Sequence, residues 1–140
     1  MQSSRLLSAA ALVATGVLIG SVGQSVLSDE KETPLLYELR TYTTVDGRLP
    51  ALHKRFKDHT LKLFEKHGMK NVVYFTPVDK PNTLVYLLAH KDMATRDASF
   101  EAFRADPDWI AARDASEKDG KIVEKVESVY LNPTDYSPMK

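Results

Sequence analysis

The side chain best suited to acid–base chemistry in this chain is His59, which lies within an apolar pattern. Phe56 and Leu63 flank it at the three- and four-residue spacing of one helical face, so its ring is expected to face a cleft between a helix and a sheet. An imidazole can take up and release a proton near neutral pH, which suits a general base or a ligand-binding group. The alternative is a semi-buried histidine that one neighbour satisfies and that serves only packing.

A second group of polar side chains lies on one face of a predicted strand. Glu38, Arg40 and Tyr42 alternate along the chain, so they share one side of an extended segment. An arginine at such a place can bind a carboxylate or another anion through its planar guanidinium. The structural alternative is a cross-strand ion pair with Lys125 or Glu127 of the last predicted strand.

Two more aromatic residues complete the candidate site. Tyr74 and Trp109 each combine a large apolar ring with a polar tip, and the tryptophan also suits a lid or a packing anchor. The expected ligand is small and either apolar or anionic. The predicted ligand-binding residues are His59, Arg40, Tyr42, Tyr74 and Trp109, of which His59 is also the candidate catalytic residue.

Several classes of chemistry lack the residues that they need. The chain has no cysteine, which excludes disulfides, thiolate nucleophiles and cysteine-based metal sites. Its histidines do not form a pair at the i, i+4 spacing of a metal motif, so no metal and no cofactor are expected. There is no glycine-rich phosphate loop and no nucleophile elbow. After the first 28 residues basic side chains are one fewer than acidic ones, and no nucleic-acid partner is expected.

The first 28 residues differ in composition from the rest of the chain. Arg5 is their only charge, and residues 6–20 are almost wholly apolar or small, as in a secretory signal peptide. The alternative is an uncleaved membrane anchor at residues 6–27, since about 20 apolar residues span a bilayer. The protein is therefore expected to be exported, periplasmic or extracellular, or else anchored by that segment. Residues 29–34 are expected to form a linker.

The remainder of the chain alternates between strand and helix patterns. Extended apolar or alternating segments predict strands, and apolar residues at three- and four-residue spacing predict helices. Asp92 is expected to cap the second helix, and Asp106 followed by Pro107 is expected to end it. The predicted strands are 35–43, 70–78, 83–90 and 122–131, and the predicted helices are 48–67, 93–105 and a short one at 108–118.

The order β-α-β-β-α-β predicts an α+β fold of the ferredoxin-like type, an antiparallel sheet with its helices on one face. The strand at 83–90 has no polar side before His90, so both faces of the sheet are expected to be apolar. A bare apolar face needs a cover. A second copy of the chain is the simplest cover, and we expect a homodimer packed sheet to sheet.

Six separated segments carry a family resemblance: YELRTYT at 37–43, FKDHT at 56–60, HG at 67–68, LVYLL at 84–88, FRADPDW at 103–109 and LNPTDYSP at 131–138. In this order they resemble the NIPSNAP family, and the resemblance covers residues 35–138. It implies a dimeric α/β-barrel domain, in which two ferredoxin-like protomers close a barrel. That superfamily includes cofactor-free monooxygenases, lactone isomerases and haem enzymes, whereas the NIPSNAP branch has no agreed catalytic activity.

Two functions remain as alternatives at this point. The first is an exported NIPSNAP-type homodimer of uncharacterised role that binds a small molecule. The second is a cofactor-independent enzyme, an isomerase or monooxygenase acting on a small organic substrate, with His59 as general base. Catalysis predicts that His59 lies within hydrogen-bonding reach of a second polar side chain facing the same void. Binding alone predicts a pocket without such a pair.

Overall fold

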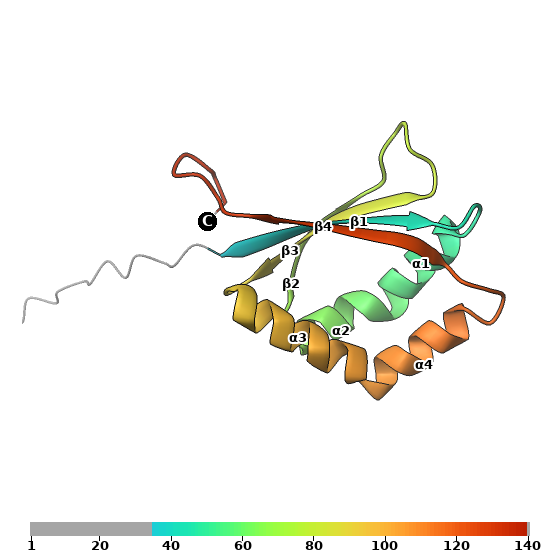
Figure 1. The fold of residues 1–140 in the computed structure, drawn as a ribbon. Coiled ribbons are helices and arrows are strands. Elements are labelled where there is room, and N and C mark those ends of the chain that lie inside the picture. The colour runs from blue at the N-terminus through green and yellow to red at the C-terminus, as the bar shows by residue number, and fades with distance from the viewer. Residues whose placement is uncertain (1–34, 140) are drawn as a thin grey trace, which may run out of the picture. The chain divides into compact units, whose positions relative to one another are not determined.

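The computed structural model of the protein describes residues 35–139, so the predicted leader at 1–28 and linker at 29–34 lie outside the described residues. No helix in the described part combines the length and the apolar character needed to cross a membrane. The elements, shown in Figure 1, are β1 (Leu36–Thr44), α1 (Leu49–Arg55), η1 (Phe56–Thr60), α2 (Leu61–Lys66), β2 (Lys70–Phe75), β3 (Thr83–His90), α3 (Met93–Ala105), α4 (Pro107–Ser116) and β4 (Val123–Leu131).

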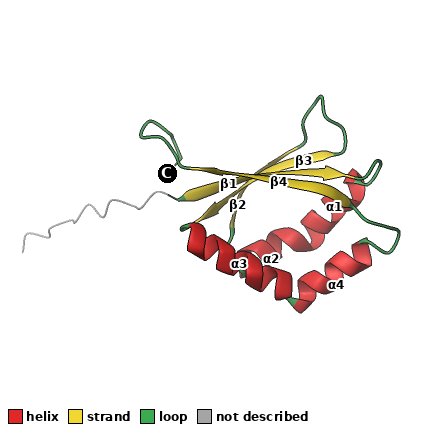
Figure 2. Cartoon of the chain, in the orientation of Figure 1, coloured by secondary structure: helices red, strands yellow, loops and turns green. Residues whose placement is uncertain are grey.

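The four strands form one sheet in the order β2-β3-β1-β4, and neighbouring strands are antiparallel. Figure 2 shows that the helices lie on one face of this sheet. The predicted ferredoxin-like α+β fold is therefore confirmed. In β1, one of the two central strands, Arg40 lies opposite Tyr86 of β3 and Ser128 of β4. This register places the alternating polar residues of β1 on the face that the helices cover.

Aromatic rings dominate the core between the helices and the sheet. Tyr86 is fully buried in β3 and stacks on Tyr74 of β2, with ring centroids 5.2 Å apart. Phe64 of α2 meets Phe103 of α3 at 4.9 Å. Such ring pairs bury large areas in defined geometries, so they fix where the helices rest on the sheet. The buried core cluster consists of Leu52, Phe56, Leu63, Phe64, Met69, Leu84, Tyr86, Leu88, Phe100, Phe103 and Ile122.

The second helical region matches the predicted boundaries closely. The Asp92 side chain accepts a hydrogen bond from the Thr95 backbone N–H at 2.7 Å and so caps α3, as expected. Asp106 is extended, and Pro107 begins α4. The strand predicted at 70–78 is shorter in the structure and ends at Phe75.

The first helical region contains a feature that the sequence did not predict. The segment η1 is a π-helical turn, in which the Leu61 N–H donates to the Phe56 carbonyl five residues earlier. The Thr60 hydroxyl also donates to the Arg55 carbonyl at 3.3 Å. A π turn holds more residues than an α turn. As a result Thr60, rather than His59, occupies the buried position on the sheet side.

No helix of residues 35–139 covers the opposite face of the sheet, here called the outer face (Figure 1). It is largely apolar, because Leu39 pairs with Leu87 and Val129 across β1, and Phe75 pairs with Val85 at the β2 side. Three of its apolar side chains are strongly exposed, namely Phe75 at 57%, Val129 at 52% and Leu131 at 41%.

Candidate functional site

A cavity of about 180 Å³ lies between the sheet and the helices. We call it the inner cavity. Tyr42 of β1 and Val126 of β4 belong to its sheet side, while Thr60 of η1 and Trp109 of α4 belong to its helix side. Two residues of the predicted ligand-binding set, Tyr42 and Trp109, thus share one cavity. Its full lining is Tyr42, Arg55, Phe56, Thr60, Phe64, Phe103, Trp109, Val123 and Val126.

Arg55 is the charged residue of the inner cavity, and it was not among the predicted site residues. It is the last residue of α1 and is only 5% exposed. Its Nη1 atom donates to Ser116 Oγ at 3.2 Å and lies 3.3 Å from Glu117 Oε1. The guanidinium stands 5.2 Å from the ring centroid of Trp109. Within the described residues, its Nε atom has no hydrogen-bond acceptor. A buried donor without a partner is unusual in proteins.

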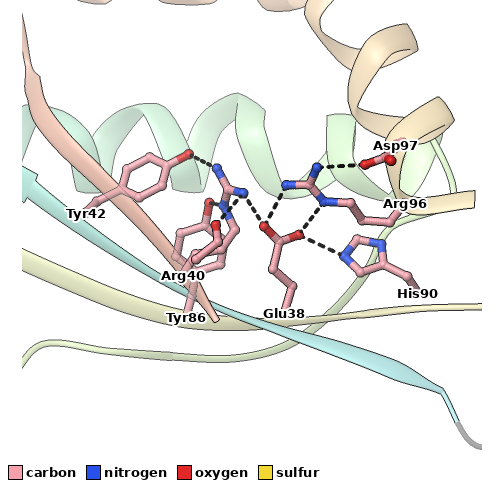
Figure 3. Close-up of polar contacts among 8 residues, drawn as sticks. Glu38, Arg40, Tyr42, Tyr86, His90, Arg96 and Asp97 are labelled. Carbon is pink, nitrogen blue, oxygen red and sulfur yellow. Dashed lines mark hydrogen bonds and ion pairs between the residues drawn. The ribbon is translucent and has the colours of Figure 1, made fainter. Parts of the chain in front are cut away.

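A buried charge network, drawn in Figure 3, lies beside the cavity and is centred on Glu38. Arg96 of α3 donates to the carboxylate from Nε at 2.9 Å and from Nη2 at 2.8 Å. Arg40 donates to it from Nη1. His90 Nε2 lies 3.3 Å from Glu38 Oε2, a contact without well-aligned hydrogen-bond geometry. Residues from β1, β3 and α3 therefore meet at one fully buried carboxylate.

The network keeps this carboxylate ionised rather than available for proton transfer. Burial alone would raise the pKa of Glu38, but the contacts with His90 and Arg96 and the charge of Arg40 outweigh it and hold the pKa well below its ordinary value. The expected ion pair of Glu38 and Arg40 with Lys125 or Glu127 is wrong. Those two residues bond to each other at 2.8 Å and pair with odd-numbered residues of β1, so they lie on the outer face.

Arg40 connects the charge network to the inner cavity. Its Nε donates to the Tyr86 hydroxyl at 2.8 Å, and its Nη2 donates to the Tyr42 hydroxyl at 3.2 Å (Figure 3). Its Nη1 also donates to Ser128 Oγ at 3.2 Å. Each nitrogen of Arg40 is therefore used inside the protein, and the residue is placed to orient Tyr42 rather than to line the cavity. The Tyr42 hydroxyl accepts from Arg40 and is also in hydrogen-bonding contact with Tyr86.

Tyr74 lies one layer behind the cavity. Its ring stacks on Tyr86 and meets Phe56 edge-on, and its hydroxyl donates to Asn71. Burial raises the pKa of Tyr74 well above its ordinary value. Tyr74 therefore packs against the core near the predicted site, and it does not line the cavity.

The expected placement of His59 between helix and sheet is wrong. The residue is exposed, on the side of η1 that faces α4, and it lines two adjoining surface hollows of about 460 and 340 Å³. The cause is the π turn, which moves Thr60 into the inward position. Within residues 35–139, His59 forms no hydrogen bond with another side chain. Asp58 and Asp108 line the same hollow, but among the described residues neither is hydrogen-bonded to His59 as a paired acid or base.

A smaller polar cluster joins the end of α2 to the start of α4. Asp106 Oδ2 lies 2.6 Å from His67 Nε2 and 2.8 Å from Lys66 Nζ. Hydrogen bonds from Lys66 and His67 hold the pKa of Asp106 well below its ordinary value. In the part of the chain that the structure describes, no group of three or more histidine, aspartate or glutamate side chains is arranged to hold a metal ion.

An antiparallel ferredoxin-like sheet with a cavity beneath its helix-covered face defines the structural class that includes the dimeric α+β-barrel proteins. Within that class the family can be stated. The chain belongs to the NIPSNAP family, whose sequence model matches residues 37–138. The resemblance inferred from the six sequence segments is thereby confirmed.

Solved structures of the same family share the fold. A NIPSNAP family protein of unknown function from Agrobacterium tumefaciens is 26% identical, with a TM-score of 0.68, over 78% of this chain and 96% of that one. A NIPSNAP domain protein from Burkholderia xenovorans, described as uncharacterized, is 29% identical, with a TM-score of 0.63, over 74% and 98% of the two chains.

A more distant structural match shows the fold alone. It is a putative antibiotic biosynthesis monooxygenase from Caulobacter crescentus, 12% identical with a TM-score of 0.52 over 73% of this chain and 92% of that one. No functionally curated protein is similar enough to match the chain.

Proposed function

We propose that this NIPSNAP-family protein is an exported homodimer that binds a small molecule in the inner cavity of each protomer. The observation that carries the proposal is a cavity with apolar walls that contains one buried cation, Arg55. Apolar walls with a few convergent polar groups are the usual composition of ligand sites. Arg55 and the Tyr42 hydroxyl supply those polar groups here.

The size of the cavity limits the ligand. Its volume of about 180 Å³ is below the roughly 300 Å³ at which pockets for drug-sized ligands begin. A nucleotide or a long acyl chain would not fit, whereas a single substituted ring or a short branched chain would. Five aromatic side chains in the lining offer such a group close contact.

The outer face supports the homodimer. Apart from the Lys125–Glu127 ion pair on β4, the described residues of the outer face are largely apolar, and a folded monomer seldom exposes a large apolar area. The strongly exposed outer-face residues Phe75 and Val129 lie on strands β2 and β4, the two edges of the sheet. A second copy of the same face would cover the whole width at once, with a total buried area above about 2,000 Å² as in obligate dimers.

Export rests on the sequence of residues 1–28. The single charge at Arg5 followed by the apolar residues 6–20 is the pattern of a signal peptide. Mass spectrometry of protein from the native cell tests this part. An N-terminus near residue 24 or 29, or intact protein in the membrane fraction, agrees with export or anchoring. Full-length protein in the soluble cytoplasm contradicts both.

The binding site is tested by filling the cavity. Saturation-transfer NMR with a library of small neutral and anionic aromatic fragments should identify compounds that bind the wild-type protein in competition with one another. Val126→Phe should abolish this binding, because the larger side chain occupies the cavity from β4. Val78→Phe is the matched control, since it makes the same change at a fully exposed position beyond the end of β2. Equal binding by both variants, or no binding by the wild type, overturns the proposed site.

The dimer is tested separately. Val129→Asp places a charge within the proposed interface and should convert the protein from dimer to monomer in light scattering or native mass spectrometry. Asp114→Asn changes an exposed charge on α4, outside the outer face, and should leave the dimer intact. A wild-type protein that is monomeric at micromolar concentration rules the dimer out.

A further inference from the structure

We propose that the ligand of the inner cavity is a small carboxylate with an aromatic or branched apolar body, whose carboxylate binds the Arg55 guanidinium and the Tyr42 hydroxyl. This inference rests on the proposed function and names the chemical class of its ligand. It also assigns Glu117 the role of an internal competitor that occupies Arg55 when the cavity is empty.

The first argument is the incomplete pairing of Arg55. Arg55 Nη1 donates both of the side-chain hydrogen bonds of this residue, one to Ser116 and one to Glu117. Its Nε atom has no acceptor among the described residues. The contact to Glu117 is 3.3 Å long, and that carboxylate is 30% exposed. A guanidinium binds a carboxylate best through two parallel hydrogen bonds. Arg55 therefore keeps the capacity for a second, better-placed anion.

The second argument is the balance of buried charge on the helix side of the sheet. Three arginines are buried or largely buried here, namely Arg40, Arg55 and Arg96, against two buried carboxylates, Glu38 and Asp106. Asp106 is already paired with Lys66 and His67. The carboxylates that partly compensate them are Glu117 at the surface and Asp97, whose side chain is 63% exposed. Placing charges of one sign in a region of low dielectric is unfavourable unless counter-charges are present. An anionic ligand in the cavity would supply one.

The third argument is the composition of the remaining wall. Trp109 stacks near the Arg55 guanidinium, and Phe56, Phe64 and Phe103 close the apolar part. An inorganic anion would leave these rings without a partner, and a neutral hydrocarbon would leave Arg55 without one. A small carboxylate with an apolar body satisfies both parts, and it is of the size that the cavity admits.

Arg55 also lines one of the surface hollows between η1 and α4, so it separates that hollow from the inner cavity. Through Ser116 and Glu117 it holds the end of α4 in place. A ligand carboxylate that binds Arg55 must compete with Glu117 for it. Removing the charge of Glu117 should therefore strengthen ligand binding, an effect that a purely structural Arg55 would not produce.

The experiment uses benzoate and its neutral analogue benzamide as probes. Trp109 is the chain's only tryptophan and lines the cavity, so its fluorescence reports binding directly. Isothermal titration calorimetry gives an independent affinity, because changes at Arg55 also alter the surroundings of the indole. Wild-type protein should bind benzoate about tenfold or more tightly than benzamide, the effect of one charge-assisted hydrogen bond.

Three variants complete the test. Arg55→Gln should weaken benzoate about tenfold and leave benzamide unchanged. Glu117→Gln should strengthen benzoate and leave benzamide unchanged. Arg113→Gln changes a partly exposed arginine of α4 that lines none of these cavities, and it should change neither affinity. If Arg55→Gln does not fold, the affinities of the wild type and of Glu117→Gln for benzoate and benzamide still test whether the cavity binds a carboxylate.

The outcomes separate this inference from the proposed function. Equal affinities for benzoate and benzamide, or a Glu117→Gln variant that binds benzoate no better than the wild type, overturn the carboxylate inference and leave a neutral-ligand cavity in place. Absence of binding by both probes and by every fragment of the library overturns the proposed function as well.

Discussion

Replacing Glu38 with glutamine should destabilise the protein strongly, because three cationic or polar partners converge on this one carboxylate. Glutamine keeps the volume of the side chain and one acceptor oxygen, but it removes the charge. Arg40 is then buried with only neutral hydrogen-bond partners, and Arg96 loses its bidentate contact. The variant thus isolates the contribution of charge from that of packing.

The magnitude follows from the burial of the partners. Removing one member of a buried ion pair costs about 3–5 kcal/mol in free energy of unfolding. Arg96 is 16% exposed and keeps its contact with Asp97, so it can turn partly towards solvent. Arg40 has no such route, since its side chain lies between the sheet and α3. We therefore expect the lower end of that range, about 3 kcal/mol at pH 7.

The loss should also depend on pH in a defined direction. The folded-state pKa of Glu38 lies below its ordinary value of 4.5, so its ionisation stabilises the fold above that pH. The stabilisation is lost as the pH falls from about 4.5 towards the folded-state pKa. The difference between wild type and Glu38→Gln should therefore be constant above about pH 5 and shrink below it, by up to about 1.4 kcal/mol per pH unit.

Urea unfolding followed by circular dichroism, at one protein concentration and at pH 7, 5 and 3.5, measures both effects. Asp97→Asn is the matched control, since it removes an exposed carboxylate from the same Arg96 and should cost no more than about 1 kcal/mol. A Glu38→Gln loss no larger than that of the control, or one that is equal at pH 7 and 3.5, would refute the reasoning.

Three further substitutions follow from the fold, and urea unfolding measures each. Phe64→Ala should cost about 3–5 kcal/mol, because the ring is almost fully buried among other rings; a cost below about 1 kcal/mol would contradict the core assignment. Thr60→Val should cost about 1 kcal/mol through loss of the hydrogen bond to the Arg55 carbonyl, and an unchanged stability would mean that this bond does not support the π turn. Asp92→Ala should lower the urea midpoint because the Thr95 N–H loses its capping acceptor, while Asp92→Asn, which retains an acceptor, should lower it less.

The parts of the fold that the sequence predicted well are bounded by residues with strong local preferences. Asp92 and Pro107 mark the two ends of α3 through capping and through the missing N–H of proline. The predicted second strand ran on to Val78 because the segment stays apolar. In the structure Pro77 and Val78 lie beyond the strand, since proline cannot donate to a strand ladder and the paired strand β3 begins only at Thr83.

The π turn could not be predicted from spacing alone. Its i to i+5 hydrogen bond competes with an α-helical alternative that has the same local sequence, and tertiary packing of Phe56 and Phe64 decides between them. The assignment of His59 to the inner face depended on a regular helix. One additional residue in the turn was enough to move that histidine to the surface.

The candidate site was predictable where the face of a side chain follows from strand alternation, as for Tyr42, which lines the inner cavity. Trp109 was a candidate because of its ring and polar tip, and it lines the cavity as well. Arg55 was missed because an arginine beside an apolar stripe usually extends its charge to solvent. Its partners Ser116 and Glu117 lie about 60 residues further along the chain, and no local pattern links them to α1.

The alternation in β1 connects the charge network to the cavity. Glu38 fixes Arg40, Arg40 fixes the Tyr42 hydroxyl, and the latter lines the inner cavity. An apolar set of similar volume often stabilises a protein as well as a buried ionic set does. A fully buried carboxylate bound by two arginines is therefore not required for a stable sheet–helix core. What it does provide is a fixed orientation for a hydroxyl at the cavity wall, which is the group that the proposed ligand would contact.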